Sequence, residues 1–252
     1  MRTLNAALLA VLIAGGAGQA QAAEGAALPK YDWSFAGVFG RFDQAALQRG
    51  LQVYREVCSA CHSLQYIAFR NLGDLGYSAD EIQAMAAEYT VTDGPNDVGD
   101  MFERPGRPAD YFPAPFPNAK AAAAANNGAA PPDLSLLAKA RAGGPSFIRA
   151  LLTGYEEPPA DFELADGQHY NIYFPGERIA MPSPLADGAV EYADGTQASA
   201  DQMAADVSTF LMWAAEPTLE RRRQLGVSVT LFLIVFTGIL YAAKRKVWSD
   251  LH

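Results

Sequence analysis

The chain has 252 residues, half of them hydrophobic, and it contains 16 prolines, 22 glycines and only two cysteines. Its net charge is −9, and residues 23–220 alone carry 27 acidic residues against 12 lysines and arginines, a balance near −15. Such a surface repels a phosphate backbone, which excludes nucleic acid as a natural partner. Composition alone is compatible both with a merely soluble acidic surface and with a docking face for a basic partner.

Residues 1–22 are typical of a secretory signal peptide. Arg2 supplies the positive start, an apolar run follows over residues 6–14, and Ala20-Gln21-Ala22 forms a small-x-small cleavage site. The apolar run is too short to cross a bilayer. We therefore expect residues 23–220 to be exported to the periplasm, with an uncleaved N-terminal anchor as the alternative.

Residues 43–57 are predicted to form a helix. Asp43 is a suitable N-cap, and one stripe of the helix carries Leu47, Leu51, Tyr54 and Val57. Gly50 lies on the same stripe, and because a glycine inside a helix costs stability, we expect it to mark a close helix crossing. The predicted partner is a helix over residues 200–215, which also has an apolar face.

Both cysteines belong to one motif that follows this helix, Cys58-Ser59-Ala60-Cys61-His62. C-x-x-C-H is the attachment pattern of a c-type haem. On a helix these three positions share a face, so the two thiols can form thioethers along one porphyrin edge while His62 gives a neutral nitrogen to the iron. A thioredoxin-like site lacks its alternating strands and helices here, a zinc site lacks ligands, and a simple disulfide would leave His62 without a role.

Three more helices are expected between this motif and the middle of the chain, over residues 78–89, 132–141 and 145–154. Ser78 and Glu81 have the spacing of a capping box, and Asp133 is expected to cap the second of the three helices. Residues 92–118 are predicted to be a loop rich in Pro, Gly and Asp. Residues 119–130 are low in complexity and compatible with a helix or with irregular structure.

The haem iron needs a sixth ligand if it is to carry electrons without binding a substrate. The candidates are Met85, Met101, Met181, Met203, Met212 and His169. Three of these methionines lie in helical patterns, where methionine more often fills the core, whereas Met101 in the acidic loop stays open and His169 is the runner-up. Met181 is followed by Pro182-Ser183-Pro184. The two prolines forbid a helix and stiffen this segment, which we call the Met181 strap. We favour Met181, because His/Met ligation also raises the reduction potential.

An uncharged apolar segment covers residues 225–243. Nineteen residues in a helix span about 28 Å, close to the roughly 30 Å of a hydrocarbon core, and buried core helices rarely run so long without a polar face. Basic residues flank both ends, so the exported N-terminus decides the orientation. We expect residues 221–246 to anchor the chain in the cytoplasmic (inner) membrane as a single pass, with residues 247–252 as a cytoplasmic tail and the haem domain on the periplasmic side.

Several long segments resemble the cytochrome c1 family, in its bacterial form with a signal peptide and one C-terminal anchor. They are RGLQVYREVCSACHSLQYIAFRNL, ANNGAAPPDLSLLAKARAGG, LLTGYEEPP, YNIYFPGERIAMPSPL and FLMWAAEP, in this order ahead of the apolar segment. The resemblance covers the chain from about residue 30 to its end. It implies an all-α fold, namely a class I c-type cytochrome-like domain with long irregular loops and one C-terminal transmembrane helix.

The resemblance also implies roles for particular residues. Met181 corresponds to the sixth iron ligand, and Arg141 lies beside a haem propionate. Asn127, Pro131 and Pro132 line the haem pocket. The second cysteine pair that steadies the ligand loop in some bacterial members is absent from this chain.

The function implied is a one-electron relay in the quinol–cytochrome c reductase (cytochrome bc1) complex. The chain, with one haem c, would take electrons from the Rieske iron–sulfur subunit, next to cytochrome b, and give them to a soluble or tethered cytochrome c. It would not be an enzyme on its own, and the complex would be dimeric. The alternatives are a membrane-tethered cytochrome serving another periplasmic dehydrogenase or a terminal oxidase, and a haem sensor or peroxidase with an open iron.

Overall fold

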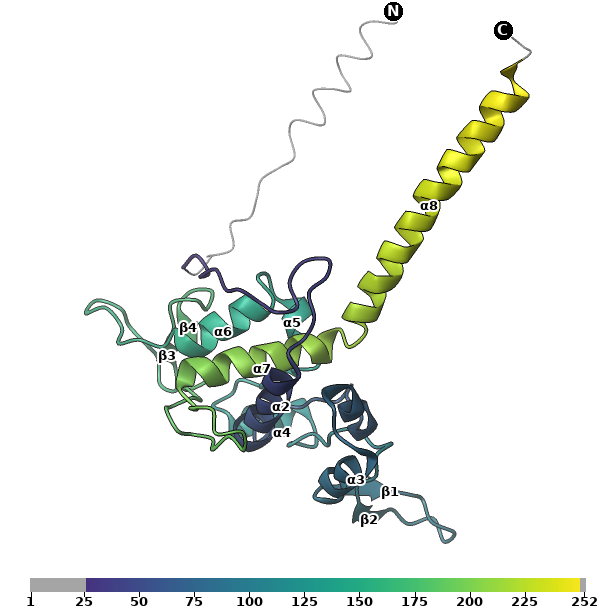
Figure 1. The fold of residues 1–252 in the computed structure, drawn as a ribbon. Coiled ribbons are helices and arrows are strands. Elements are labelled where there is room, and N and C mark those ends of the chain that lie inside the picture. Colours follow the sequence, from purple (N-terminus) through teal and green to yellow (C-terminus); the bar gives the residue numbers. More distant parts are fainter. Residues whose placement is uncertain (1–25, 250–252) are drawn as a thin grey trace, which may run out of the picture.

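The computed structural model describes residues 26–249 of the chain (Figure 1). The predicted signal peptide and the last three residues of the predicted tail lie outside the described residues. The helices are α2 (Gln44–Val53), the π-helix η1 (Tyr54–Cys58), the 3-10 helix η2 (Phe69–Leu75), α3 (Ala79–Ala87), α4 (Ala119–Ala125), α5 (Leu137–Ala140), α6 (Pro145–Thr153), α7 (Ala200–Ala215) and α8 (Leu219–Val247). The strands are β1 (Thr90–Asp93), β2 (Phe102–Pro105), β3 (His169–Tyr170) and β4 (Arg178–Ile179).

Helix α2 crosses α7 at Gly50, as the sequence predicts. A Cβ atom added at Gly50 would lie 2.2 Å from the backbone oxygen of Asp206 and 2.6 Å from the Cβ of Phe210. Because any side chain would collide there, glycine allows the two backbones to meet. The carboxylate of Asp43 accepts hydrogen bonds from the first amides of α2, which confirms the predicted cap. The two apolar faces then form the centre of the core, with Leu47, Leu51, Tyr54, Met203, Val207, Phe210 and Trp213 all buried.

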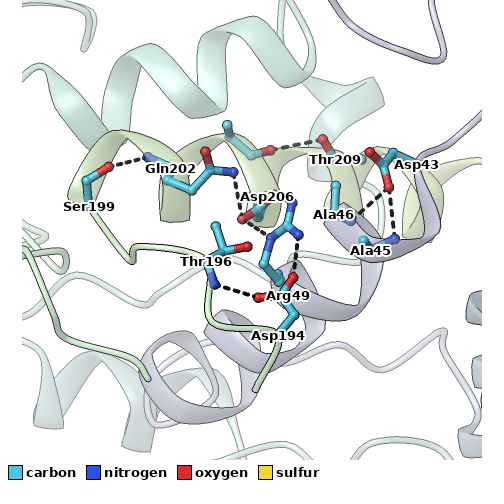
Figure 2. Close-up of polar contacts among 11 residues, drawn as sticks. Asp43, Ala45, Ala46, Arg49, Asp194, Thr196, Ser199, Gln202, Asp206 and Thr209 are labelled. Atoms are coloured by element: carbon cyan, nitrogen blue, oxygen red, sulfur yellow. Dashed lines mark hydrogen bonds and ion pairs between the residues drawn. The ribbon is translucent and has the colours of Figure 1, made fainter. Parts of the chain in front are cut away.

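An ion-pair network holds the same crossing on its polar side (Figure 2). Arg49 on α2 donates to both carboxylate oxygens of Asp206 on α7, at 2.9 and 3.1 Å, and to Asp194 at 2.8 Å. The side chain of Asp206 is only 2% exposed, and it also accepts from Gln202 at 3.0 Å. A buried carboxylate is costly without a partner, so the Arg49 guanidinium fixes the position of α2 along α7.

Two small antiparallel sheets depart from the all-α prediction, although its helix-rich part is confirmed. β1 pairs with β2, with Thr90 opposite Pro105, and β3 pairs with β4, with His169 opposite Ile179. The first hairpin occupies part of the predicted loop over residues 92–118, and ion pairs from Arg104 to Asp93 and Asp110 tie it down. Strands of two to four residues are too short to give a recognisable alternation in the sequence.

The other predicted helices are confirmed except one. Helix α3 begins with the capping box of Ser78 and Glu81, and α6 begins at Pro145 and ends at Thr153, with Gly154 as its C-cap. The helix predicted over residues 132–141 is wrong in its first turn, because α5 covers only Leu137–Ala140. The helix predicted over residues 43–57 changes to π geometry at its end, and η2 was not expected.

Helix α8 runs out of the domain as one long helix (Figure 1). Its 29 residues include all of the predicted apolar span, with a mean hydropathy of 2.2 over the most apolar stretch and none of that stretch buried. By length and composition α8 is a candidate membrane span. A core helix of a soluble domain would be mostly buried, which α8 is not.

Candidate haem site

The C-x-x-C-H motif lies in a single turn at the end of η1. The amides of Cys61 and His62 both donate to the carbonyl of Cys58, at 3.1 and 2.9 Å. One turn earlier the amide of Ser59 reaches back to the carbonyl of Tyr54, the widened spacing of a π-helix, which often occurs at functional sites. The turn therefore holds both thiols and the imidazole on adjacent positions, as the spacing predicts.

The imidazole of His62 is oriented by a backbone carbonyl. Its Nδ1 lies 2.8 Å from the oxygen of Pro132. A carbonyl can only accept, so Nδ1 carries the proton and Nε2 keeps its lone pair. Burial lowers the pKa of His62, more than the hydrogen bond to Pro132 raises it. The ring is therefore neutral and oriented by a partner, the form in which histidine ligates a metal, and so the residues present fit a haem iron.

The segment that supplies this carbonyl also holds the residues that follow His62. Asp133 accepts hydrogen bonds from the hydroxyl of Ser63 at 2.7 Å, the amide of Gln65 at 3.0 Å and the amide of Ser135 at 2.9 Å. Burial raises the pKa of the Asp133 carboxyl, but these hydrogen bonds together lower it below its ordinary value. Because the carboxylate is engaged in this way, it does not cap a helix, which corrects the predicted helix start.

The two thiols have different surroundings. Cys58 is half-buried and packs against the hydrophobic core, whereas Cys61 is exposed, and both are free thiols. Burial raises the pKa of the Cys58 thiol to about 12, so the unmodified side chain is neutral. The motif therefore lies at the edge of the core, which suits an apolar group attached on one side and covered from the other.

Met181 lies on a strap that follows β4. Its side chain is half-buried, and the hydroxyl of Tyr155 donates to its carbonyl at 3.0 Å. Two residues before Met181, Ile179 of β4 pairs with His169 of β3. Tyr155 itself forms an isolated antiparallel β-bridge with Asn171. The strap is thus attached at its start to a short hairpin and at the Met181 carbonyl to Tyr155, which follows the C-cap of α6.

The other ligand candidates are placed as follows. Met85 and Met203 are buried in the core and Met212 packs against it, in keeping with their predicted role as core filler. Met101 is 60% exposed in the segment between β1 and β2. His169 is half-buried in β3, on the same hairpin from which the Met181 strap leaves. The helical methionines are therefore core residues, whereas Met101 and His169, the two other candidates that the sequence left open, are not fully buried.

The remaining predicted pocket residues are only partly brought together. Pro132 contacts His62 directly, and Pro131 beside it is half-buried. Arg141 is exposed at the end of α5, and among residues 26–249 its guanidinium has no ion-pair partner, which leaves it free for an anion. Asn127 is exposed with φ 51°, and its amide lies against Gly167, where a Cβ would come within 2.9 Å. The structure therefore places Pro132 at the imidazole and gives Arg141 and Asn127 other neighbours.

Sequence reasoning missed two residues that hold the site. Asp133 was interpreted as a helix cap, because Asp after Pro and ahead of an apolar run has that local pattern. Tyr155 has no local signal, since its hydroxyl acts on a carbonyl 26 residues away. Such contacts become visible only when distant segments are seen side by side.

The chain is similar to known proteins over nearly its whole length. The model of the Cytochrome C1 family matches residues 33–251. A "Cytochrome c1" of Rhodospirillum rubrum is 52% identical, over 95% of this chain and 94% of that protein. A mitochondrial "Cytochrome c1, heme protein" of Schizosaccharomyces pombe is 50% identical, over 90% of this chain and 74% of that protein. A "Cytochrome b/c1" of Bradyrhizobium diazoefficiens is 53% identical over 96% of this chain, which spans only 38% of that protein.

Proposed function

Because the chain belongs to the cytochrome c1 family, we propose that it is the membrane-anchored haem subunit of a cytochrome bc1 complex and relays single electrons there. The observation that carries the proposal is the turn from Cys58 to His62, in which Nδ1 of His62 lies 2.8 Å from the Pro132 carbonyl. Haem c, when bound, supplies an iron that accepts and gives one electron. The chain makes and breaks no bond in a substrate, so it is an electron-transfer subunit and not an enzyme on its own.

Each site residue has a proposed task. Cys58 and Cys61 would hold the haem through two thioethers, and Nε2 of His62 would ligate its iron. Met181 would be the other protein ligand of the iron, which the stiff proline strap and the hydrogen bond from Tyr155 support. The unpaired guanidinium of Arg141 neutralises a haem propionate. Three further residues, Asn127, Pro131 and Pro132, line the pocket.

The proposed partners follow from the family and from charge. The protein receives electrons from the Rieske iron–sulfur subunit, next to cytochrome b, and delivers them to a soluble or tethered cytochrome c in a dimeric complex. The charge near −15 over residues 23–220 favours a basic acceptor. Raising the ionic strength should therefore slow reduction of a soluble acceptor, as measured by stopped-flow, and a rate independent of salt would contradict this docking mode.

The proposed topology uses α8 as the membrane anchor after signal cleavage. Residues 1–22 are the signal peptide, residues 23–220 form the periplasmic domain, residues 221–246 cross the cytoplasmic membrane and residues 247–252 form the tail. The exposure of the apolar stretch of α8 supports this arrangement, because such a surface is stable only in lipid or against a partner.

The test begins with the native protein purified in mild detergent. We expect a haem spectrum that survives denaturation and acid–acetone extraction, and companions that include a b-type cytochrome and an iron–sulfur protein. Cys58→Ser with Cys61→Ser should give colourless denatured protein, whereas Ser59→Ala in the same turn should keep the colour. Colourless wild-type protein would overturn the proposal, and dehydrogenase or oxidase companions would favour the tethered cytochrome. Carbon monoxide binding by the reduced wild-type protein at neutral pH would favour a sensor or peroxidase.

A further inference from the structure

A cavity of about 540 Å³ lies where the N-terminal end of α2, the C-terminal end of α7 and the first turns of α8 meet. Its apolar wall includes Leu47 and Trp213, each 2% exposed. Its charged wall consists of Arg41, Arg221, Asp74 and Glu220, and the Glu220 carboxylate accepts a hydrogen bond from the amide of Phe42. The cavity is separate from the haem site, since none of its lining residues belongs to the C-x-x-C-H turn, to residues 127–141 or to the Met181 strap.

The walls of this cavity are fixed by contacts between the domain and α8. The amide of Phe42 donates to the carboxylate of Glu220 at 2.8 Å, and the guanidinium of Arg223 donates to the carbonyl of Phe35. Figure 1 shows the segment ahead of α2 reaching the junction of α7 and α8. The first turn of α8 is therefore held against the domain, and the cavity lies between them.

The cavity lies at the edge of the predicted membrane span. Arg221 precedes Leu225, the first residue of the apolar stretch, by four residues, which is about 6 Å along a helix. This distance places the cavity at the depth of lipid headgroups, on the side of the domain. Below it, the apolar face of α8 is exposed from Leu225 onward, with Leu231 and Phe232 each more than half exposed.

Three of the four charged groups at the cavity have no side-chain partner within residues 26–249. Among the described residues, neither Arg41 nor Arg221 forms an ion pair or a side-chain hydrogen bond, and the carboxylate of Asp74 has none either. The neighbouring Arg222 differs, because it is paired with Glu216 at 2.5 Å. Two free guanidiniums and one free carboxylate around one cavity complement a ligand that carries both a phosphate and a cation.

We propose that this cavity binds the headgroup of a phosphoethanolamine-type phospholipid from the periplasmic leaflet. Arg41 and Arg221 bind the phosphate, Asp74 faces the ammonium group, and the acyl chains follow the exposed apolar face of α8. The bound lipid would fix the angle between the haem domain and its anchor. The inference depends on the proposed function in one respect only, the membrane location of α8, and it does not depend on haem.

The experiment uses the full-length haem-loaded chain in mild detergent, titrated with phosphatidylethanolamine and followed by native mass spectrometry. Arg41→Gln combined with Arg221→Gln should bind this lipid about tenfold more weakly, since two exposed guanidinium–phosphate ion pairs are lost. Arg222→Gln is the matched control, because it removes a charge from the same helical turn but outside the cavity, and it should bind like the wild type. Asp74→Asn should lose the preference for phosphatidylethanolamine over phosphatidylglycerol.

Equal lipid binding by the wild type and the double variant would overturn the proposal, and so would an equal loss in Arg222→Gln. Displacement of the lipid by inorganic phosphate alone would also overturn it, as would cross-links from this cavity to another subunit that fills it in the intact complex. Carbonate extraction of membranes separates these results from the function: a chain that stays in the membrane but binds no lipid contradicts only the lipid site, whereas a chain that is released contradicts the anchor.

Discussion

The two segments proposed to hold the iron are built differently. The turn that carries His62 continues α2 through η1, and the segment around Pro132 and Asp133 holds it by several hydrogen bonds. The strap that carries Met181 is irregular, leaves a hairpin of two-residue strands and has Tyr155 as its side-chain support. The histidine side is therefore part of the folded core, whereas the methionine side is an attachment to it. Changes on the first should affect folding, and changes on the second should affect mainly ligation.

The largest expected effect is on the methionine side. Met181→Leu keeps the volume and the covalent haem but removes the thioether, so the midpoint potential should fall by on the order of a tenth of a volt or more. Redox titration measures this, and the methionine-to-iron near-infrared band of the oxidised form should vanish. Met212→Leu, a similar change at a methionine packed on the core, should leave both unchanged. If His169→Ala lowers the potential and Met181→Leu does not, the assignment of the sixth ligand is wrong.

The next effect is on the support of the histidine side. Gly50→Ala places a Cβ 2.2 Å from the backbone of α7, so the helices must separate, at a cost of about 3 kcal/mol. Thermal unfolding of the full chain in detergent should show a lower midpoint. Gly226→Ala in α8 is the control, because an added Cβ has nothing within 4 Å there. An unchanged midpoint in Gly50→Ala would show that the crossing is not tight.

A smaller loss is expected at the segment that holds His62. Asp133→Ala leaves the donors on Ser63, Gln65 and Ser135 without their acceptor, which should lower the free energy of unfolding by about 2 kcal/mol. The covalent haem and the methionine band should remain, because neither the thiols nor Met181 is touched. The exposed Asp97→Ala serves as the control for charge. A variant that is as stable as the wild type would show that Asp133 does not stabilise the segment that holds His62.

The smallest effect is expected from the hydrogen bond that the Tyr155 hydroxyl donates to the strap. Tyr155→Phe removes one hydrogen bond to the Met181 carbonyl, worth about 1 kcal/mol. The near-infrared band should disappear at a lower temperature than in the wild type, while global unfolding moves little. Tyr111→Phe, at an exposed tyrosine far along the chain, should have no effect on the band. If Tyr155→Phe shifts both transitions equally, the strap is part of the core after all.

Local sequence patterns predicted those features well that depend on one residue and on residues close to it in the sequence. The Asp43 and Ser78 caps, the start of α6 at Pro145 and the crossing at Gly50 all appear as expected, because each depends on residues within a few positions or on a missing side chain. The short sheets and the start of α5 were not predicted. In both cases backbone groups pair with partners that local propensity does not describe.

The sequence by itself predicted the haem chemistry and the anchor that we propose for this protein. Two thiols and an imidazole within one turn, and an unbroken apolar stretch, are patterns whose meaning depends only on spacing along the chain. The tertiary structure decided which carbonyl accepts the hydrogen bond of His62, what Asp133 binds, what supports Met181 and where a cavity opens beside α8. These contacts join residues 26 to 70 positions apart, and hydrogen bonds of that reach exist only after the core has brought the segments together.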